Sequence, residues 1–158
     1  MPARRAASRH PIHPALVHFP VACWTAVPVM DALYLLRQAP LWWRCAFWLL
    51  VVGGVSALAA MATGLWELLT LPDLHPGQRA AQRHMLLMGS AWTVFMLDLL
   101  LRSPVALPSP AMAWAGAAVS TAGFGVLLVG AWTGAELVYR YGVGRGPADN
   151  GETGGAPE

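Results

Sequence analysis

Four long apolar segments alternate with short connections along the chain, and this pattern predicts four helices. The segments run over residues 15–36, 45–69, 85–101 and 111–138. A helix that spans a bilayer needs about 20 mainly apolar residues, with a lower end near 17, so each segment is long enough. Every connection contains proline, which breaks helical continuity, at Pro40, Pro72, Pro76, Pro104, Pro108 and Pro110.

The length of the connections determines how the helices run. Connections this short make neighbouring helices antiparallel. We therefore expect an all-α fold, an integral membrane four-helix bundle over residues 14–141. Residues 1–13 form a predicted N-terminal arm on the cytoplasmic side. Residues 142–158 are rich in glycine with scattered acids, and we expect a disordered tail there.

The composition supports a membrane protein. Hydrophobic residues make up 56% of the 158 residues and charged residues only 11%, against about 25% charged residues in soluble domains. A soluble fold with so few charges would leave large apolar patches in water. The formal net charge of +2 is too small for a nucleic-acid-binding surface. The lipid bilayer is the expected partner, and nucleic acid is not.

The distribution of arginine predicts the orientation in the membrane. The N-terminus, the connection between the second and third segments and the C-terminus share one side of the predicted bundle. That side carries Arg4, Arg5, Arg9, Arg79, Arg83, Arg140 and Arg145, and the other side carries Arg37, Arg44 and Arg102. Since positive residues stay on the cytoplasmic side, both termini are predicted to be cytoplasmic.

Polar residues inside the apolar segments occur in the same order in both halves of the chain. Histidine, aspartate, arginine and glutamate follow one another at His18, Asp31, Arg37 and Glu67, and again at His84, Asp98, Arg102 and Glu136. This order predicts a duplicated helical hairpin whose halves are related by an axis along the membrane normal. A chance match within a uniformly apolar background is the alternative.

The repeated residues are predicted to lie at two depths. The aspartates and arginines fall near the face opposite the termini, where we expect them to anchor the helices at the interface. Asp98 and Arg102 have the i, i+4 spacing of a local ion pair. The histidines and glutamates fall at the cytoplasmic end, where polar groups within helices usually have a function.

Two histidines on facing helices suit a b-type haem. His18 and His84 would supply neutral imidazoles as axial ligands. Glu67, Glu136 or Arg140 would contact a propionate or orient an imidazole. The predicted function is an electron-transfer or redox-partner subunit, and no catalytic residue is predicted.

Other interpretations of the same residues stay open. Imidazole and carboxylate together bind divalent metals, with His13, His18, Glu67 and His84 as candidate ligands. His13 and His18 are five residues apart, about 140° around a helix, so they do not share a face. Intramembrane His and Glu also serve proton or ion transport. Without a cofactor, the histidines would be helix-end residues of a membrane scaffold or accessory subunit.

Two strings resemble the signatures of a known family. The sequence HPALVHFP at residues 13–20 and GAELVYRYGVG at residues 134–144 are similar to the two ends of the bacterial family called domain of unknown function 2231. The resemblance covers about residues 12–145. It implies a four-helix bacterial inner-membrane protein with no established activity. Some members are found near cytochromes, which favours a redox role and a redox partner or membrane subunit. This chain has Ala135 and Tyr141 where members often have Gly and His.

Overall fold

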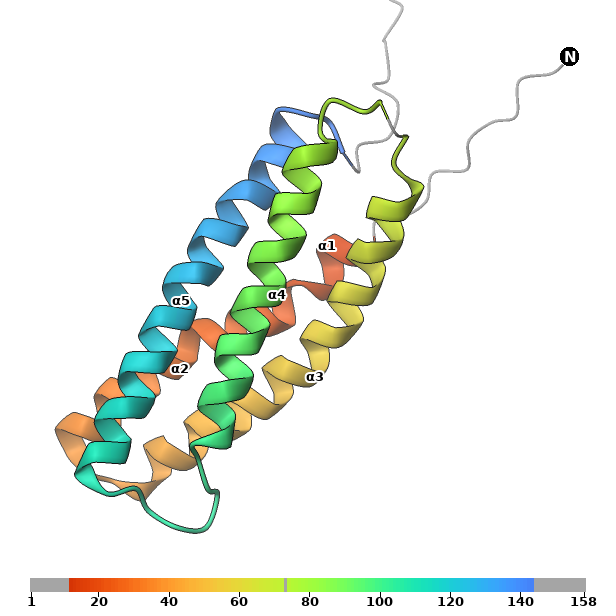
Figure 1. Cartoon of the computed structure of the whole chain (residues 1–158). Coiled ribbons are helices and arrows are strands. Elements are labelled where there is room, and N and C mark those ends of the chain that lie inside the picture. The colour runs from red at the N-terminus through yellow and green to blue at the C-terminus, as the bar shows by residue number, and fades with distance from the viewer. Residues whose placement is uncertain (1–11, 73, 144–158) are drawn as a thin grey trace, which may run out of the picture.

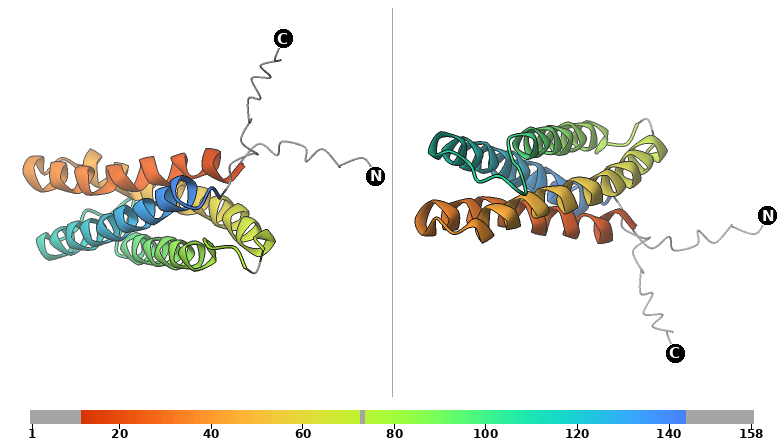
Figure 2. Two further views of the ribbon diagram at one scale, coloured as in Figure 1. Left: turned by 90° about the horizontal axis from the view of Figure 1, so that it is seen from above. Right: turned by 90° about the horizontal axis from the view of Figure 1, so that it is seen from below.

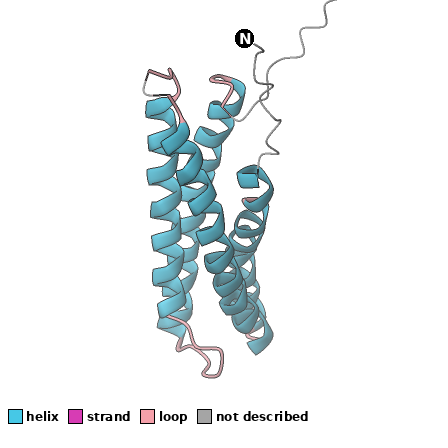
Figure 3. Cartoon of the chain, turned by 90° about the vertical axis from the view of Figure 1, so that its right-hand side faces the viewer, coloured by secondary structure: helices cyan, strands magenta, loops and turns pink. Residues whose placement is uncertain are grey.

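The computed structural model describes residues 12–72 and 74–143. Most of the predicted N-terminal arm, up to residue 11, and the predicted tail from residue 144 lie outside the described residues. The described chain forms helices joined by loops, and no strand occurs in it (Figure 3). The helices are α1 (Ile12–Leu16), α2 (His18–Arg37), α3 (Pro40–Thr70), α4 (Gln78–Leu100) and α5 (Pro110–Tyr139) (Figure 1). The predicted all-α four-helix bundle is therefore confirmed.

Three of the long helices begin earlier than the apolar pattern predicts. α3 begins at Pro40 and α5 at Pro110, because proline fits the first turn of a helix, where its missing N–H is not needed. The Ser109 hydroxyl accepts a hydrogen bond from the Met112 N–H at 3.3 Å and caps α5. α4 begins at Gln78 rather than near residue 85. Residues 78–84 are mostly polar, so the apolar pattern does not include them, although they form helix.

A break separates α1 from α2. The sequence predicts one bent helix from about residue 15, with His13 before it, whereas α1 already begins at Ile12 and ends at Leu16. Pro20 has no N–H to donate to the Leu16 carbonyl, so the helical hydrogen bonding is interrupted there. Figure 1 shows α1 as a short helix offset from α2.

The four long helices form a closed antiparallel bundle. α2 packs against α3 and α5, and α4 packs against α5 and α3 (Figures 1 and 2). The α2–α3 and α4–α5 connections lie at one end of the bundle, and the α3–α4 connection lies at the other end. α1 packs mainly against α3, and this contact positions the site described below.

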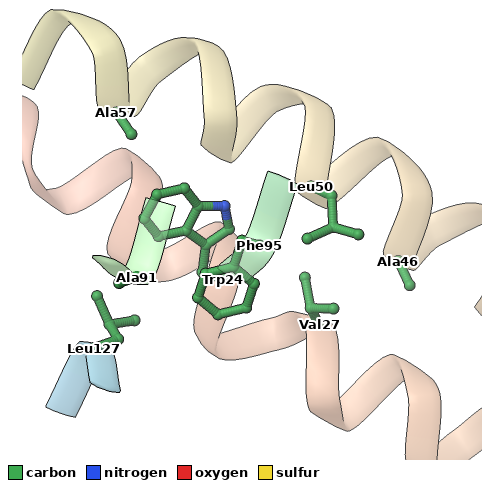
Figure 4. Packing of buried hydrophobic residues seen from close by; sticks show 8 residues of the cluster. All are labelled: Trp24, Val27, Ala46, Leu50, Ala57, Ala91, Phe95 and Leu127. Atoms are coloured by element: carbon green, nitrogen blue, oxygen red, sulfur yellow. The ribbon is translucent and has the colours of Figure 1, made fainter. Parts of the chain in front are cut away.

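The core is built around two stacked aromatic rings. The rings of Trp24 and Phe95 have centroids 4.7 Å apart and planes 17° apart. Val27 and Leu50 pack beside them (Figure 4). A Cβ atom on Gly53 would lie 2.5 Å from Trp24 Nε1, so only glycine leaves room for the indole. Small residues let membrane helices approach closely in this way.

The buried positions repeat between the two hairpins. Six of the seven buried residues of α3 recur 70 residues later in α5, and Gly54 is the exception. The pairs are Trp43 and Ala113, Ala46 and Gly116, Leu50 and Ser120, Gly53 and Gly123, Ala57 and Leu127, and Ala60 and Gly130. In α2 and α4 the buried aspartates Asp31 and Asp98 are 67 residues apart. This agreement is what a duplicated hairpin predicts.

Three stretches are long and apolar enough to cross a membrane. They are Ile12–Arg37, Pro40–Thr70 and Pro110–Tyr139. α4, which contains the predicted third span, does not meet the same criterion, because its N-terminal half carries glutamines, arginines and a histidine. Large apolar side chains are exposed on the outer surface, including Trp48, Trp66, Trp114 and Trp132. Exposed residues of this kind fit contact with lipid.

Candidate functional site

His13 is held against α3 by its Nδ1 atom. This atom lies 2.8 Å from the Ala60 carbonyl oxygen and 3.3 Å from Thr63 Oγ1. A carbonyl oxygen only accepts hydrogen bonds, so Nδ1 carries the proton and donates it. In the neutral ring the lone pair is then on Nε2. A Cβ atom on Gly64 would lie 2.8 Å from the ring carbon Cε1, so the ring depends on glycine at that position.

His84 has the same environment on α5. Its Nδ1 atom lies 2.9 Å from the Gly130 carbonyl oxygen and 3.4 Å from Thr133 Oγ1. A Cβ atom on Gly134 would lie 2.8 Å from its Cε1 atom. Its neutral ring is therefore also protonated on Nδ1, with the lone pair on Nε2. Each hairpin thus supplies one histidine with the same tautomer and the same glycine beneath it.

The histidine of the first half that corresponds to His84 is therefore His13. The structure does not bring His18, the predicted partner of His84, into the cavity that His84 lines. His18 is exposed, and its Nδ1 atom is 3.4 Å from the Ala15 carbonyl oxygen of its own segment. His13 lies against α3 because α1, which carries it, packs on that helix. The Thr-Gly pairs at residues 63–64 and 133–134 were the sequence signal, because a histidine precedes each threonine by about 50 residues.

Both histidines line one cavity between the helices. The cavity volume is about 400 Å³, within the range of roughly 300–1,000 Å³ for small-molecule and cofactor pockets. Its walls are mainly apolar and include Trp24, Met61, Met85, Met88 and Leu127. Neither histidine Nε2 atom has a hydrogen bond within the described part of the chain. Two basic nitrogens therefore border one apolar space.

The other predicted site residues divide into two groups. Glu67 lines the same cavity as His13 and His84. Glu136 and Arg140 instead form an exposed ion pair at 2.8 Å, in a separate shallow depression. Exposed pairs of this kind contribute about 0–1 kcal/mol to stability. The structure thus brings Glu67 to the histidines and keeps Glu136 and Arg140 apart from them.

The predicted divalent-metal ligands are not gathered into a multi-ligand group within the described residues. Among residues 12–72 and 74–143, no group of three or more His, Cys, Asp or Glu side chains could hold a metal ion. Zinc sites in proteins need at least three such ligands. The predicted divalent-metal ligands His13, His18, Glu67 and His84 do not form such a group, since His18 does not line the cavity that the other three line.

A second polar centre lies at the opposite end of the bundle. Arg102 Nη1 is 2.6 Å from Asp31 Oδ1, and Arg102 Nη2 is 2.9 Å from Asp98 Oδ2. Ser120 Oγ donates to Asp31 Oδ2 at 2.6 Å, and the guanidinium lies 4.5 Å from the centroid of the Trp43 ring. The predicted Asp98–Arg102 pair is confirmed. Of the predicted interface anchors, Asp31, Asp98 and Arg102 are instead buried, at 2%, 0% and 7% exposed, whereas Arg37 is exposed at the end of α2.

Comparison with known proteins identifies a family. The family described as "Predicted membrane protein (DUF2231)" matches residues 9–147, which is most of the chain and includes all five helices. No curated protein and no solved structure gives a significant match.

Proposed function

The chain belongs to the DUF2231 family of predicted membrane proteins, and we propose that this multi-pass protein binds a b-type haem and transfers electrons. The proposed axial ligands are His13 and His84. One observation carries the proposal: both imidazoles donate from Nδ1 to a backbone carbonyl and border the same apolar cavity. Metal-ligating histidines usually donate their other ring N–H in this way, which fixes the tautomer and the ring orientation.

Each neighbouring residue has a role in this proposal. The carbonyl groups of Ala60 and Gly130 fix the two tautomers, and Gly64 and Gly134 leave space for the rings. The apolar walls exclude water and lower the local dielectric, which tunes a redox potential. The haem supplies one-electron exchange when it is bound.

An absorption spectrum of the purified protein tests the proposal. The protein would be produced with a haem supply and purified in detergent. We expect a Soret band that both His13→Ala and His84→Ala remove. His18→Ala is the matched control, because His18 is exposed and does not line the cavity, and it should keep the band.

Two results would contradict this function. A colourless, well-folded wild-type protein would leave a membrane scaffold or accessory subunit as the function. A band that His18→Ala removes and His13→Ala keeps would show that the ligands are not those proposed. Circular dichroism of each variant shows whether the helices are intact.

A further inference from the structure

We propose that the buried centre formed by Asp31, Asp98 and Arg102 is a proton-binding site that holds one proton on Asp98. This site lies at the other end of the bundle from the histidines and does not depend on haem. Its ligand is a single proton, and its role is to keep the bundle interior neutral.

The charges at this centre do not balance without a proton. Two carboxylates share one guanidinium, and the side chains of Asp31, Asp98 and Arg102 are 2%, 0% and 0% exposed. With all three groups ionised, the centre carries a net charge of −1. A buried net charge is strongly unfavourable, especially in a protein surrounded by lipid. One bound proton removes it.

No other charged group compensates the centre. Asp98 interacts electrostatically with Arg102 and Asp31, and Arg102 interacts with the two aspartates. α5 contributes the neutral Ser120 hydroxyl. α3 contributes the Trp43 ring, which packs against Tyr34 of α2. Within the described residues, every helix packed on the centre is thereby accounted for.

The hydrogen bonds identify which carboxylate holds the proton. Asp31 accepts from two guanidinium nitrogens, at 2.6 and 2.8 Å, and from the Ser120 hydroxyl. Donors from two residues stabilise its charged form. Asp98 receives hydrogen bonds from Arg102 alone within the described residues.

One guanidinium nitrogen, Arg102 Nη2, also has too few hydrogens to satisfy every carboxylate oxygen around it, and the shortage falls on Asp98. Arg102 Nη2 has two hydrogens, yet it lies 2.8 Å from Asp31 Oδ2 and 3.0 and 2.9 Å from the two Asp98 oxygens. Three acceptors therefore compete for two hydrogens. Within the described chain, Asp98 Oδ2 has no donor other than this shared Nη2. We therefore place the proton on this oxygen.

Paired isosteric variants test the position of the proton. Asp31→Asn and Asp98→Asn remove the same charge from the same centre. Asparagine resembles a protonated aspartic acid, so Asp98→Asn should keep the melting temperature of the detergent-purified protein near the wild-type value at neutral pH. Asp31→Asn should lower it by several degrees or prevent folding. Equal losses, or a larger loss for Asp98→Asn, would overturn the assignment.

Infrared spectroscopy tests the proton itself. Wild-type protein at neutral pH should show the C=O stretch of a protonated carboxylic acid, shifted in D₂O and absent from Asp98→Asn. Glu67→Gln is the matched control, because Glu67 lies at the histidine cavity, and it should keep the band. A wild-type spectrum without the band would overturn the proposal. A band that appears only in sodium-free buffer would do so too, because it would indicate a bound cation.

Discussion

Two glycines determine whether the imidazole rings can occupy their positions. Gly64 and Gly134 each lie where a Cβ atom would be 2.8 Å from a histidine Cε1 atom. This distance is too short for a real contact, so the ring must move if a methyl group is added. The glycines therefore matter for the site more than for the helices that contain them.

We expect Gly64→Ala and Gly134→Ala to weaken haem binding by about 5-fold to 140-fold, because overpacking of this kind costs about 1–3 kcal/mol. Haem titration of the apoprotein measures the effect. Gly125→Ala is the control, since a Cβ atom there meets no atom within 4 Å. Unchanged affinity in both site variants would show that the ring positions do not control binding.

Gly53 has a comparable role in the core. A Cβ atom there would meet the Trp24 indole at 2.5 Å, so Gly53→Ala is expected to lower the free energy of unfolding by about 1–3 kcal/mol. Thermal or denaturant unfolding in detergent measures it. Gly89→Ala is the matched control in another helix and has open space at Cβ. It should be neutral or slightly stabilising, because alanine is the better helix former. Equal stability of both variants would contradict the close packing.

At the scale of the helices, the contact of α1 with α3 decides where His13 lies. α1 is only five residues long and packs against α3, although Val17 between α1 and α2 keeps helical φ and ψ angles and its N–H donates to the His13 carbonyl at 3.1 Å. The hydrogen bond from the His13 Nδ1 atom to the Ala60 carbonyl joins this short helix to α3. The interruption is confined to the Leu16 carbonyl, to which Pro20 has no N–H to donate.

We expect Pro20→Ala to reduce haem binding without unfolding the bundle. Alanine restores the N–H that the Leu16 carbonyl lacks, so α1 and α2 tend to form one helix and His13 moves away from α3. The Soret absorbance per protein measures the loss. Pro28→Ala is the control, because Pro28 lies inside α2, away from the break. A full Soret band in Pro20→Ala would show that the break does not position His13.

The helices themselves could be predicted because apolar length alone specifies them, whereas their ends and contacts could not. The polar start of α4 carries no apolar pattern, so its first seven residues were missed. The sequence pattern places His13 in the predicted arm before the first helix, whereas its contact with Ala60 depends on a residue 47 positions away. Tertiary contacts of this kind leave no local signal.

For the whole molecule, the arrangement of the loops predicts the orientation in the membrane. Arg79 and Arg83 follow the α3–α4 connection, while Arg102 beside the α4–α5 connection is buried in the bundle. Arg140 is also exposed at the α3–α4 end, whereas Arg37 and Arg44 are exposed at the α2–α3 connection. The predicted excess of arginine on the cytoplasmic side therefore comes mainly from Arg4, Arg5, Arg9 and Arg145, which lie outside the described residues.

Labelling of intact cells with a membrane-impermeant thiol reagent checks this orientation. In a protein whose Cys23 and Cys45 are replaced, we expect Val105→Cys to be labelled from outside the membrane and Leu74→Cys to be protected. Both positions are highly exposed, at 81% and 97%, so access should depend on the side alone. Labelling in the opposite pattern would show that the orientation is the reverse of the predicted one. As a control, Leu74→Cys should be labelled in either orientation once the membrane is opened.

The repeat could be predicted only in outline. The order of the polar residues indicated two related hairpins, and the aspartates at residues 31 and 98 indeed occupy equivalent buried places. The sequence pattern pairs His84 with His18 rather than with His13, because the separation of His18 from His84 is closer to the spacing of the two aspartates. The sequence could not predict that Arg102 binds both aspartates, because Asp31 and Arg102 are 71 residues apart.

The shared arginine also makes the two hairpins unequal partners. Position 35, which corresponds to Arg102 at the 67-residue offset, is a leucine, so Asp31 has no arginine at the equivalent buried position of its own hairpin, where Arg37 and Arg44 are exposed. Two copies of that hairpin would bring two acids together in a lipid environment without a buried arginine between them. If the chain were divided at the α3–α4 connection, the two fragments should therefore reassemble only with each other, as an obligate heterodimer, despite their common architecture.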